Sequence, residues 1–379
     1  MKTFKTRIYL NDFTVQYCKR AFGVRRCIWN WAVAESINGR KQHKKRPSAY
    51  ALDKSYREYL KTQKDSCFVW LAEQQTSARL MQEVLKDVDQ AFKLAVAKKG
   101  RKANVHFKKR KDRKQTFSGY CSMPADFRIE GDYSFSFQAA GRGRRGTGRT
   151  RESLAFLRNA KICKFTIKCV AGEYWIAISY EKPNRTITKS LNGAIGIDLG
   201  IVKSVCAFDG TTYSDVSFNT KHSLHLDRLA RQNDEKLSRK KEGSRRYKKL
   251  LLLKQRRALR ATRCREAKLE EYTSYLTNTF KTIVVDDFTF KGALKVSDRK
   301  KAYRCMKYQF KIRLEQKAAV SGTTIKYVEH HKGQKTTHKC SQCGSEHVHT
   351  NSQRQFHCLD CGYTADRDAN AARCSFQLA

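Results

Sequence analysis

Four cysteines near the C-terminus have the spacing of a metal site. They form two CxxC pairs with 14 residues between the pairs, and they are Cys340, Cys343, Cys358 and Cys361. Two such pairs can supply four thiolates to one tetrahedral zinc ion, and Gly344 and Gly362 permit the tight turns that this requires. Four thiolates leave no open coordination position, so we predict one structural zinc ion. The histidines that could replace a thiolate are His338, His347, His349 and His357.

Acidic residues occupy three positions from which a second kind of metal site could be built. Asp198 and Asp286 each end a short apolar run, and Asp366 and Asp368 precede a helix predicted to begin at Asn370. Because Mg²⁺ binds hard oxygen ligands, carboxylates from several elements could together hold catalytic ions. An ionised carboxylate in a buried strand costs on the order of several kcal/mol unless it is compensated, which favours a metal ligand at Asp198. The alternative roles are a strand-end cap for Asp198 and helix caps for Asp366 and Asp368.

The net charge predicts a polyanionic partner. Lys and Arg number 79 against 35 Asp and Glu, a formal charge of +44 spread along most of the chain. A field of this size favours binding to nucleic acid. No apolar run approaches the roughly 20 residues that span a bilayer, and the N-terminal segment has no apolar signal core. We therefore expect no membrane partner, a cytoplasmic, nucleoid-associated protein, and reduced thiols at the cysteines outside the CxxC pairs.

The first hundred residues predict one strand and a helical lobe. Residues 4–10 alternate as a strand does, and residues 18–37 have helical spacing. A second helix is predicted from apolar residues at three- and four-residue steps, namely Leu80, Val84, Leu85, Val88, Phe92 and Ala95.

The next segment predicts β structure rich in basic residues. In residues 98–117, Lys and Arg surround apolar residues, which favours a strand or loop facing nucleic acid over a solvated face. Residues 133–138 predict a strand. The Gly- and Arg-rich stretch 141–151 is expected to be too flexible for a packed element and to order only on RNA or DNA. Residues 163–169 and 174–180 predict a hairpin with one basic face.

The second half predicts an α/β sheet domain. Residues 222–280 read as two basic helices that break at Gly243-Ser244, and a face so basic is expected to lie along a phosphate backbone. Their packed face is predicted to include Leu269, Tyr272, Leu276 and Phe280. Strands are predicted at 194–198, 205–208, 211–216, 283–287 and 323–329, and a helix at 303–320. Since successive strand residues point to opposite faces, only one of Asp286 and Asp287 can share a site with Asp198.

Several stretches together resemble the TnpB family of transposon-encoded proteins, relatives of type V CRISPR effectors that carry an RNase H-like RuvC nuclease domain. IGIDLGIVKSVCAFDG resembles the first RuvC motif and IVVDDFTFKGAL the second. CSQCG and FHCLDCGYTADRDANAA resemble the zinc ribbon and third motif. WNWAVAES, the 70–93 helix, FKKRKDRKQTF and the basic 225–280 hairpin are similar as well, so the resemblance covers nearly the whole chain.

The resemblance implies an RNA-guided DNA endonuclease that cuts double-stranded target DNA beside a short adjacent motif. The guide would be an RNA from the transposon end, held by one monomer per RNA. The match implies catalysis at Asp198, Asp286 and Asp368, with two Mg²⁺ ions bound there. The family has Glu where this chain has Asp286, a side chain shorter by one methylene.

The resemblance also implies a mixed α/β and β architecture with defined boundaries. Residues 1–19 would hold the first strand of an N-terminal wedge-like β-barrel, 20–98 an inserted helical recognition lobe, and 99–188 the rest of the barrel. Residues 189–379 would form the RuvC-like domain, with a helical insertion at 222–280 and the zinc ribbon at 336–364. The expected nucleic-acid contacts are Lys108, Lys109, Arg110, Arg113, Arg245, Arg246, Lys248 and Lys249.

Three other functions fit part of this pattern. With Asp286 in place of Glu, the same RNA-guided complex could bind DNA without cutting it. An RNase H-type transposase also requires three acidic residues but would leave the basic N-terminal half without a role. A non-catalytic zinc-ribbon protein would bind RNA and not engage DNA.

Overall fold

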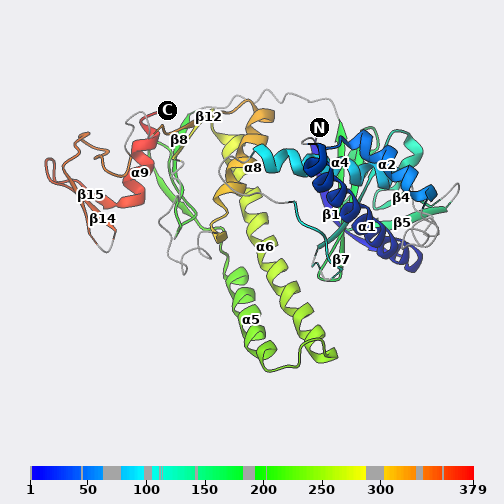
Figure 1. The fold of residues 1–379 in the computed structure, drawn as a ribbon. Coiled ribbons are helices and arrows are strands. Elements are labelled where there is room, and N and C mark those ends of the chain that lie inside the picture. The colour runs from blue at the N-terminus through cyan, green and yellow to red at the C-terminus, as the bar shows by residue number, and fades with distance from the viewer. Residues whose placement is uncertain are drawn as a thin grey trace. The chain divides into compact units, whose positions relative to one another are not determined.

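The chain folds into two compact units, Met1–Pro183 and Asn184–Ala379, and each is described by itself. The computed structural model describes residues 2–43, 46–62, 78–97, 105–110, 112, 114–140, 144–181, 193–201, 203–286, 303–329, 336–351 and 354–379. Figure 1 traces the chain from its blue N-terminal helices to the red C-terminal helix.

The described residues of the N-terminal unit form a seven-stranded antiparallel sheet and three helices. The strands are β1 (Lys2–Leu10), β2 (Lys114–Tyr120), β3 (Phe127–Gly131), β4 (Ser134–Ala140), β5 (Arg144–Thr150), β6 (Lys161–Val170) and β7 (Glu173–Glu181), in the order β2-β6-β7-β1-β5-β4-β3. The helices are α1 (Asp12–His43), α2 (Ala49–Thr62) and α4 (Ala78–Ala97), with short 3-10 turns η1 (Pro124–Asp126) and η2 (Ala155–Leu157). The predicted strand at 4–10 and the predicted hairpin of β6 and β7 are confirmed.

Phenylalanine rings hold this sheet in a curled shape. Phe127 on the edge strand β3 lies 5.3 Å from Phe165 on β6, and Phe137 on β4 lies 5.1 Å from Phe165, measured between ring centres. Tyr17 of α1 packs on the same group, 5.9 Å from Phe117. Strands from both ends of the sheet therefore share one aromatic core. Among the described strands no pairing joins β2 to β3, and closure into a barrel stays a prediction.

The expectation of a flexible stretch at 141–151 is wrong for its described part, because residues 144–150 form β5. This strand pairs with β4 and with β1. Its glycines lie under aromatic rings: a Cβ at Gly146 would lie 2.5 Å from the Phe137 ring, and one at Gly148 would lie 2.7 Å from the Phe135 ring. Glycine here makes room for a neighbouring ring, a packing role that composition alone does not distinguish from flexibility.

The first helix begins earlier than predicted. Helix α1 starts at Asp12 rather than near residue 18, so the segment 1–19 holds a strand and two turns of helix. Asn11 causes this start, since its Oδ1 accepts a hydrogen bond from the amide of Thr14 at 2.8 Å. Asn followed by Asp is a helix-start signal, and the strand pattern before it obscured the boundary.

The C-terminal unit is built on a five-stranded mixed sheet with the order β10-β9-β8-β11-β12. Its strands are β8 (Ala194–Asp198), β9 (Val205–Phe208), β10 (Tyr213–Val216), β11 (Thr282–Asp286) and β12 (Thr324–Tyr327). Strands β8, β11 and β12 run parallel, whereas β9 pairs antiparallel with both of its neighbours, β8 and β10. These elements confirm the predicted strands, and helix α8 (Lys307–Ser321) begins four residues later than expected, after Met306 at φ 55°.

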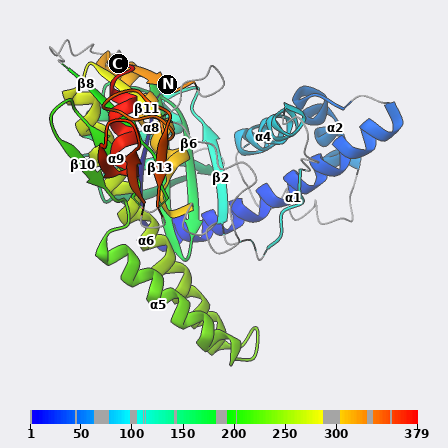
Figure 2. The same ribbon diagram turned by 90° about the vertical axis from the view of Figure 1, so that its left-hand side faces the viewer.

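Two long helices form the predicted insertion. Helices α5 (Lys221–Ser238) and α6 (Arg245–Thr279) lie side by side as a hairpin (Figure 2), capped by Thr220 and Ser244. The predicted packed face is confirmed, because Leu269, Tyr272, Leu276 and Phe280 are buried. Helix α6 is long enough to cross a bilayer but strongly basic, and no helix in the described part of the chain has the apolar length of a membrane span.

The chain ends in a small hairpin sheet and one helix. Strands β13 (Val348–Thr350), β14 (Gln355–Cys358) and β15 (Thr364–Asp366) pair in that order, and α9 (Arg367–Phe376) follows directly. Figure 1 shows α9 lying against β8 of the five-stranded sheet. The final helix thus links the cysteine-bearing hairpin to the sheet.

We expect Gly146→Ala to destabilise the N-terminal unit by about 1–3 kcal/mol, because a methyl group would press on the Phe137 ring in a packed core. Thermal unfolding of the purified protein measures this loss. Arg149→Ala, an exposed position on the same strand, serves as the control and should change stability little. Equal stability of both variants would contradict the packing role.

Candidate functional site

The four predicted cysteines converge on one point. Their sulfur atoms all lie within 4.8 Å of one another, with Cys340 3.7 Å from Cys361 and Cys343 3.6 Å from Cys358. Thiolates that each lie about 2.3 Å from a tetrahedral zinc ion are about 3.8 Å apart, so the sulfur positions fit this ion. The four histidines are not part of the cluster.

Each pair of cysteines is held in a tight turn. The amide of Gly344 donates to the Cys340 carbonyl at 2.9 Å, and the amide of Gly362 donates to the Cys358 carbonyl at 3.0 Å. Both glycines have positive φ, 78° and 71°, which confirms the reason predicted for glycine there. Buried Phe356 packs beneath the cluster as the small core of this hairpin.

The cysteine hairpin is tied to α9 through buried Asn370. The Asn370 amide nitrogen donates to the Lys339 carbonyl at 2.8 Å, and its Oδ1 accepts from the Ser341 amide at 3.0 Å. Gln377 adds a hydrogen bond to the Ser341 carbonyl at 2.7 Å. A change at the zinc site therefore reaches the helix that carries Asp368.

The sheet and α9 bring the three predicted aspartates together. In the parallel pairing of β8 and β11, Asp198 and Asp286 are direct register partners. Helix α9 approaches β8 at Gly196, where a Cβ would lie 2.3 Å from the Ala372 carbonyl oxygen. This glycine lets the helix come close enough to place Asp368 beside the ends of both strands.

The carboxylates act on one another electrostatically. Burial, followed by the nearby charges of Asp368 and Asp286, raises the pKa of Asp198 to about 7. Such a cluster of carboxylates, inside a largely buried region, favours a cation. Within the described residues, the four cysteines are the only group of three or more His, Cys, Asp or Glu residues whose ligand atoms all lie within 4.8 Å of one another. The three aspartates do not form so tight a group in this structure.

Two of the three aspartates have polar partners of their own. Asp286 accepts a hydrogen bond from the hydroxyl of Thr336, and both residues are buried. Asp368 accepts from the guanidinium of Arg354 and, at 3.5 Å, from that of Arg367. Sequence reasoning missed Thr336 and Arg354 because neither stands beside an aspartate in the chain.

Asp366 and Asp368 have different positions at the start of helix α9. Helix α9 begins at Arg367, not at Asn370, and Asp366 is its N-cap: Oδ1 accepts from the amides of Asp368 and Ala369. Asp368 lies inside the first turn with a side chain 6% exposed. The capping alternative thus holds for Asp366. Asp287, the other candidate after β11, lies outside the described residues.

The predicted nucleic-acid contacts differ in how available they are. The four predicted contacts on α6 are all exposed, namely Arg245, Arg246, Lys248 and Lys249. Lys108 is engaged: its Nζ lies 3.7 Å from the centre of the Trp29 ring, and burial lowers its pKa to about 8. Lys109 and Arg110 are exposed in the irregular segment 105–110, and Arg113 lies outside the described residues.

The seven-stranded sheet carries a further basic and aromatic face. Burial of alternate residues turns Lys5, Arg7 and Tyr9 outward on β1. Lys5 Nζ lies 5.8 Å from the Trp175 ring centre, and the Arg7 guanidinium carbon lies 5.4 Å from that of Tyr9. Lys168 is the register partner of Trp175 on the next strand. Rings flanked by cations are suited to unpaired bases and their phosphates.

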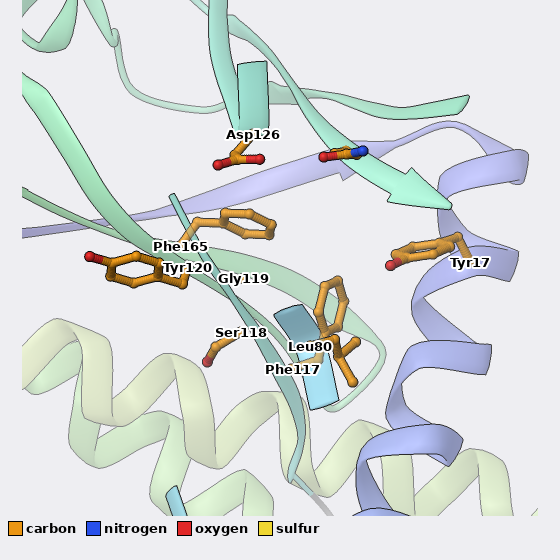
Figure 3. Close-up of a pocket in the computed structure, with 9 residues that line it drawn as sticks. Tyr17, Leu80, Phe117, Ser118, Gly119, Tyr120, Asp126 and Phe165 are labelled. Atoms are coloured by element: carbon orange, nitrogen blue, oxygen red, sulfur yellow. The ribbon is translucent and has the colours of Figure 1, made fainter. Parts of the chain in front are cut away.

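A small pocket in the N-terminal unit is not a candidate for chemistry. Figure 3 shows the rings of Tyr17, Phe117, Tyr120 and Phe165 around it, with Asp126 at its rim. Its volume is about 20 Å³, close to what one ordered water needs. Asp126 already accepts hydrogen bonds from the amides of Ser122 and Met123.

Three family models match the chain. They are a helix-turn-helix domain of OrfB_IS605 proteins at residues 1–45, the OrfB_IS605 "Probable transposase" at 177–297, and the "Cas12f1-like, TNB domain" at 308–374. In this structure the described part of residues 1–45 forms β1 and the single helix α1. The third model spans the zinc hairpin and Asp368.

Whole-chain relatives agree with these matches. A Streptomyces pristinaespiralis protein named "Putative RNA-guided DNA endonuclease" is 24% identical over 98% of this chain and 88% of its own. A protein of Escherichia coli strain K12 with the same name and the label InsQ is 26% identical over 80% of this chain and 74% of its own. These matches agree with the resemblance of the sequence motifs to the TnpB family.

Solved structures share the fold at low sequence identity. A Cas12f1 chain from a complex with guide RNA and target DNA has a TM-score of 0.61 at 12% identity, covering 99% of this chain and 98% of that one. The mini-RNA-guided endonuclease Cas-phi3 has a TM-score of 0.53 at 9% identity, covering 100% and 92%. The likeness extends over both units of the mixed α/β and β fold.

We expect Cys340→Ser to release zinc and to loosen α9, because the metal-bound turn holds Asn370 and so the helix start. Zinc content by elemental analysis and thermal unfolding should fall together. Cys264→Ser, a partly buried cysteine on α6, is the matched control and should retain zinc. Full zinc content in Cys340→Ser would contradict the four-thiolate site.

Proposed function

We propose that this protein is an RNA-guided DNA endonuclease of a transposable element, which cuts double-stranded DNA beside a short adjacent motif. The observation that carries the proposal is the register pairing of Asp198 with Asp286 on parallel strands, together with the charge of Asp368 that acts on Asp198 from helix α9. The names of the relatives and the fold shared with Cas12f1 support it.

The donor set fits divalent cations at the aspartates and zinc at the cysteines. Burial and the nearby charges of Asp368 and Asp286 raise the pKa of Asp198. Carboxylates are hard, anionic ligands of the kind Mg²⁺ takes. When bound there, Mg²⁺ ions would activate a water and stabilise the leaving oxygen of a phosphodiester. Asp198, Asp286 and Asp368 would hold the two ions, while the four cysteines would hold the structural zinc.

The chain's own residues support this role of the carboxylates. Thr336 fixes one oxygen of Asp286 and thereby sets the direction of the shorter side chain. Lys203 bridges Asp366 at 3.4 Å and Asp215 at 2.7 Å, which ties the N-terminus of α9 to β10. Both contacts restrict the ligands before any ion arrives, as preorganisation requires.

Two surfaces suit the nucleic acids. The exposed cations of α6 can follow a phosphate backbone, and the Trp175 and Tyr9 face of the seven-stranded sheet can take unpaired bases. We assign the guide RNA, from the transposon end, to the N-terminal unit, read as a wedge-like β-barrel with its helical lobe. The RNase H-like RuvC domain would comprise residues 189–379. One monomer of the protein would bind each RNA.

The second candidate is the same complex without cleavage. It is favoured by one observation: Asp286 stands where the family has Glu, and its carboxylate already accepts from Thr336. If the shorter side chain of Asp286 fails to reach its ion, Asp286→Glu should restore or raise cleavage. If Asp286 does reach its ion, the same substitution should lower cleavage. DNA binding without nicking in the parent protein would establish this alternative.

We expect the protein, purified with its co-expressed RNA, to cleave a guide-matched plasmid in Mg²⁺. Sequencing that RNA identifies the guide. Asp198→Ala and Asp368→Ala should each lower the rate by at least about a hundredfold, the scale on which a lost electrostatic stabiliser acts. Glu235→Gln, which changes an exposed carboxylate on α5, is the control and should cleave at the parent rate. Cleavage that persists in Asp198→Ala would exclude the proposed site.

Changing the exposed α6 cations Arg245, Arg246, Lys248 and Lys249 to Gln should weaken the salt dependence of nucleic-acid binding. The slope of log K against log salt should fall by about 0.7 to 0.9 per lost phosphate contact. A charge-preserving variant, with Lys at 245 and 246 and Arg at 248 and 249, should keep the slope. An unchanged slope in the Gln variant would mean that these side chains are solvated only.

A further inference from the structure

The cysteine hairpin places an arginine against one of the three carboxylates, Asp368. Arg354 lies between β13 and β14 at φ 69°, a left-handed conformation that is uncommon for a non-glycine residue. Its amide donates to the Asn351 carbonyl at 3.0 Å, and its carbonyl accepts from the Arg367 amide at 2.9 Å. The backbone therefore fixes the place of this side chain on α9.

The Arg354 guanidinium is the closest charge partner of Asp368. Its Nη2 donates to Oδ2, whereas Arg367 reaches the other oxygen, Oδ1, at 3.5 Å. The Asp368 side chain is 6% exposed and that of Arg354 34%. A buried carboxylate needs a compensating charge, and Arg354 supplies it at Oδ2 of Asp368. The same oxygen would lie 3.8 Å from a Cβ at Gly200, which follows β8.

We propose that Arg354 is a positioning residue that competes with a divalent cation for Asp368 and so sets the metal affinity of the carboxylate site. The proposal rests on the proposed function, since it presupposes that Asp368 is a metal ligand. An oxygen that accepts from a guanidinium has that lone pair occupied, and an ion must displace the contact to use it. The positive charge beside the site also opposes a second cation.

The proposal has a further structural consequence. Arg354 belongs to the hairpin held by the four cysteines, so the zinc site would influence the carboxylate site through this contact as well as through Asn370. When a metal ion displaces the Arg354 guanidinium from Asp368, the arginine side chain stays near the site, because the backbone of Arg354 is hydrogen-bonded to Arg367 of α9.

The test is a Mn²⁺ titration of the zinc-loaded full chain, with free Mn²⁺ followed by electron paramagnetic resonance. Arg354→Gln should bind Mn²⁺ about fivefold more tightly, the change that a partly exposed ion pair of about 1 kcal/mol predicts. Arg354→Lys should bind about twofold more tightly, because an ammonium keeps the charge without the fork of donors. Arg313→Gln removes an arginine paired with Glu270 and should leave the affinity unchanged.

A second readout separates competition from a merely structural role. Without added Mn²⁺, the melting temperature of Arg354→Gln should be lower than that of the parent protein. The rise in melting temperature on adding Mn²⁺ should be larger for the variant. If Arg354→Gln does not fold, Arg354→Lys decides the question by the same titration. Equal or weaker Mn²⁺ binding in the folded variant overturns the proposal.

The outcomes also distinguish this inference from the proposed function. If Asp198→Ala binds as much Mn²⁺ as the parent protein does, the carboxylate site holds no Mn²⁺. The metal-dependent nuclease and the competition by Arg354 are then both overturned. If the parent binds Mn²⁺ through Asp198 and Arg354→Gln binds it no more tightly, only the role of Arg354 is overturned.

Discussion

Repulsion between carboxylates is the constraint around which the C-terminal unit is arranged. Asp198 and Asp286 are register partners on parallel strands, and the charge of Asp368 acts on Asp198 from α9. Asp286 and Asp368 are buried. Left uncompensated, such a cluster would destabilise the fold. Hydrogen bonds compensate two of these groups: Thr336 donates to Asp286, and Arg354 and Arg367 donate to Asp368.

The surrounding elements are explained by the need to keep those groups together. Gly196 opens β8 to the backbone of α9, and Asn370 fastens that helix to the cysteine-bound turn. The cysteine-bearing hairpin thus fixes the position of α9, and an ion bound by its four thiolates would have no open coordination position. The N-terminal unit contributes charge and aromatic surface, which suit nucleic acid rather than catalysis.

Much of this arrangement could be predicted from the sequence, and the exceptions have physical causes. Cysteine spacing and the apolar run before Asp198 are local signals, and the structure reproduces the cysteine cluster and the strand. Thr336 and Arg354 could not be found, because their partners lie 50 and 14 residues away and only the fold brings them together. Strand β5 was misjudged because glycine under a ring and glycine in a flexible chain look alike in sequence.

Divalent cations held jointly by the carboxylates of Asp198, Asp286 and Asp368 would be visible in an experimental structure of the RNA-bound protein with Mn²⁺, measured with anomalous scattering. We expect manganese peaks bonded to oxygens of all three aspartates, with zinc confined to the four sulfurs. Carboxylates that remain on their protein partners, with no manganese between them, would mean that these aspartates hold no ion.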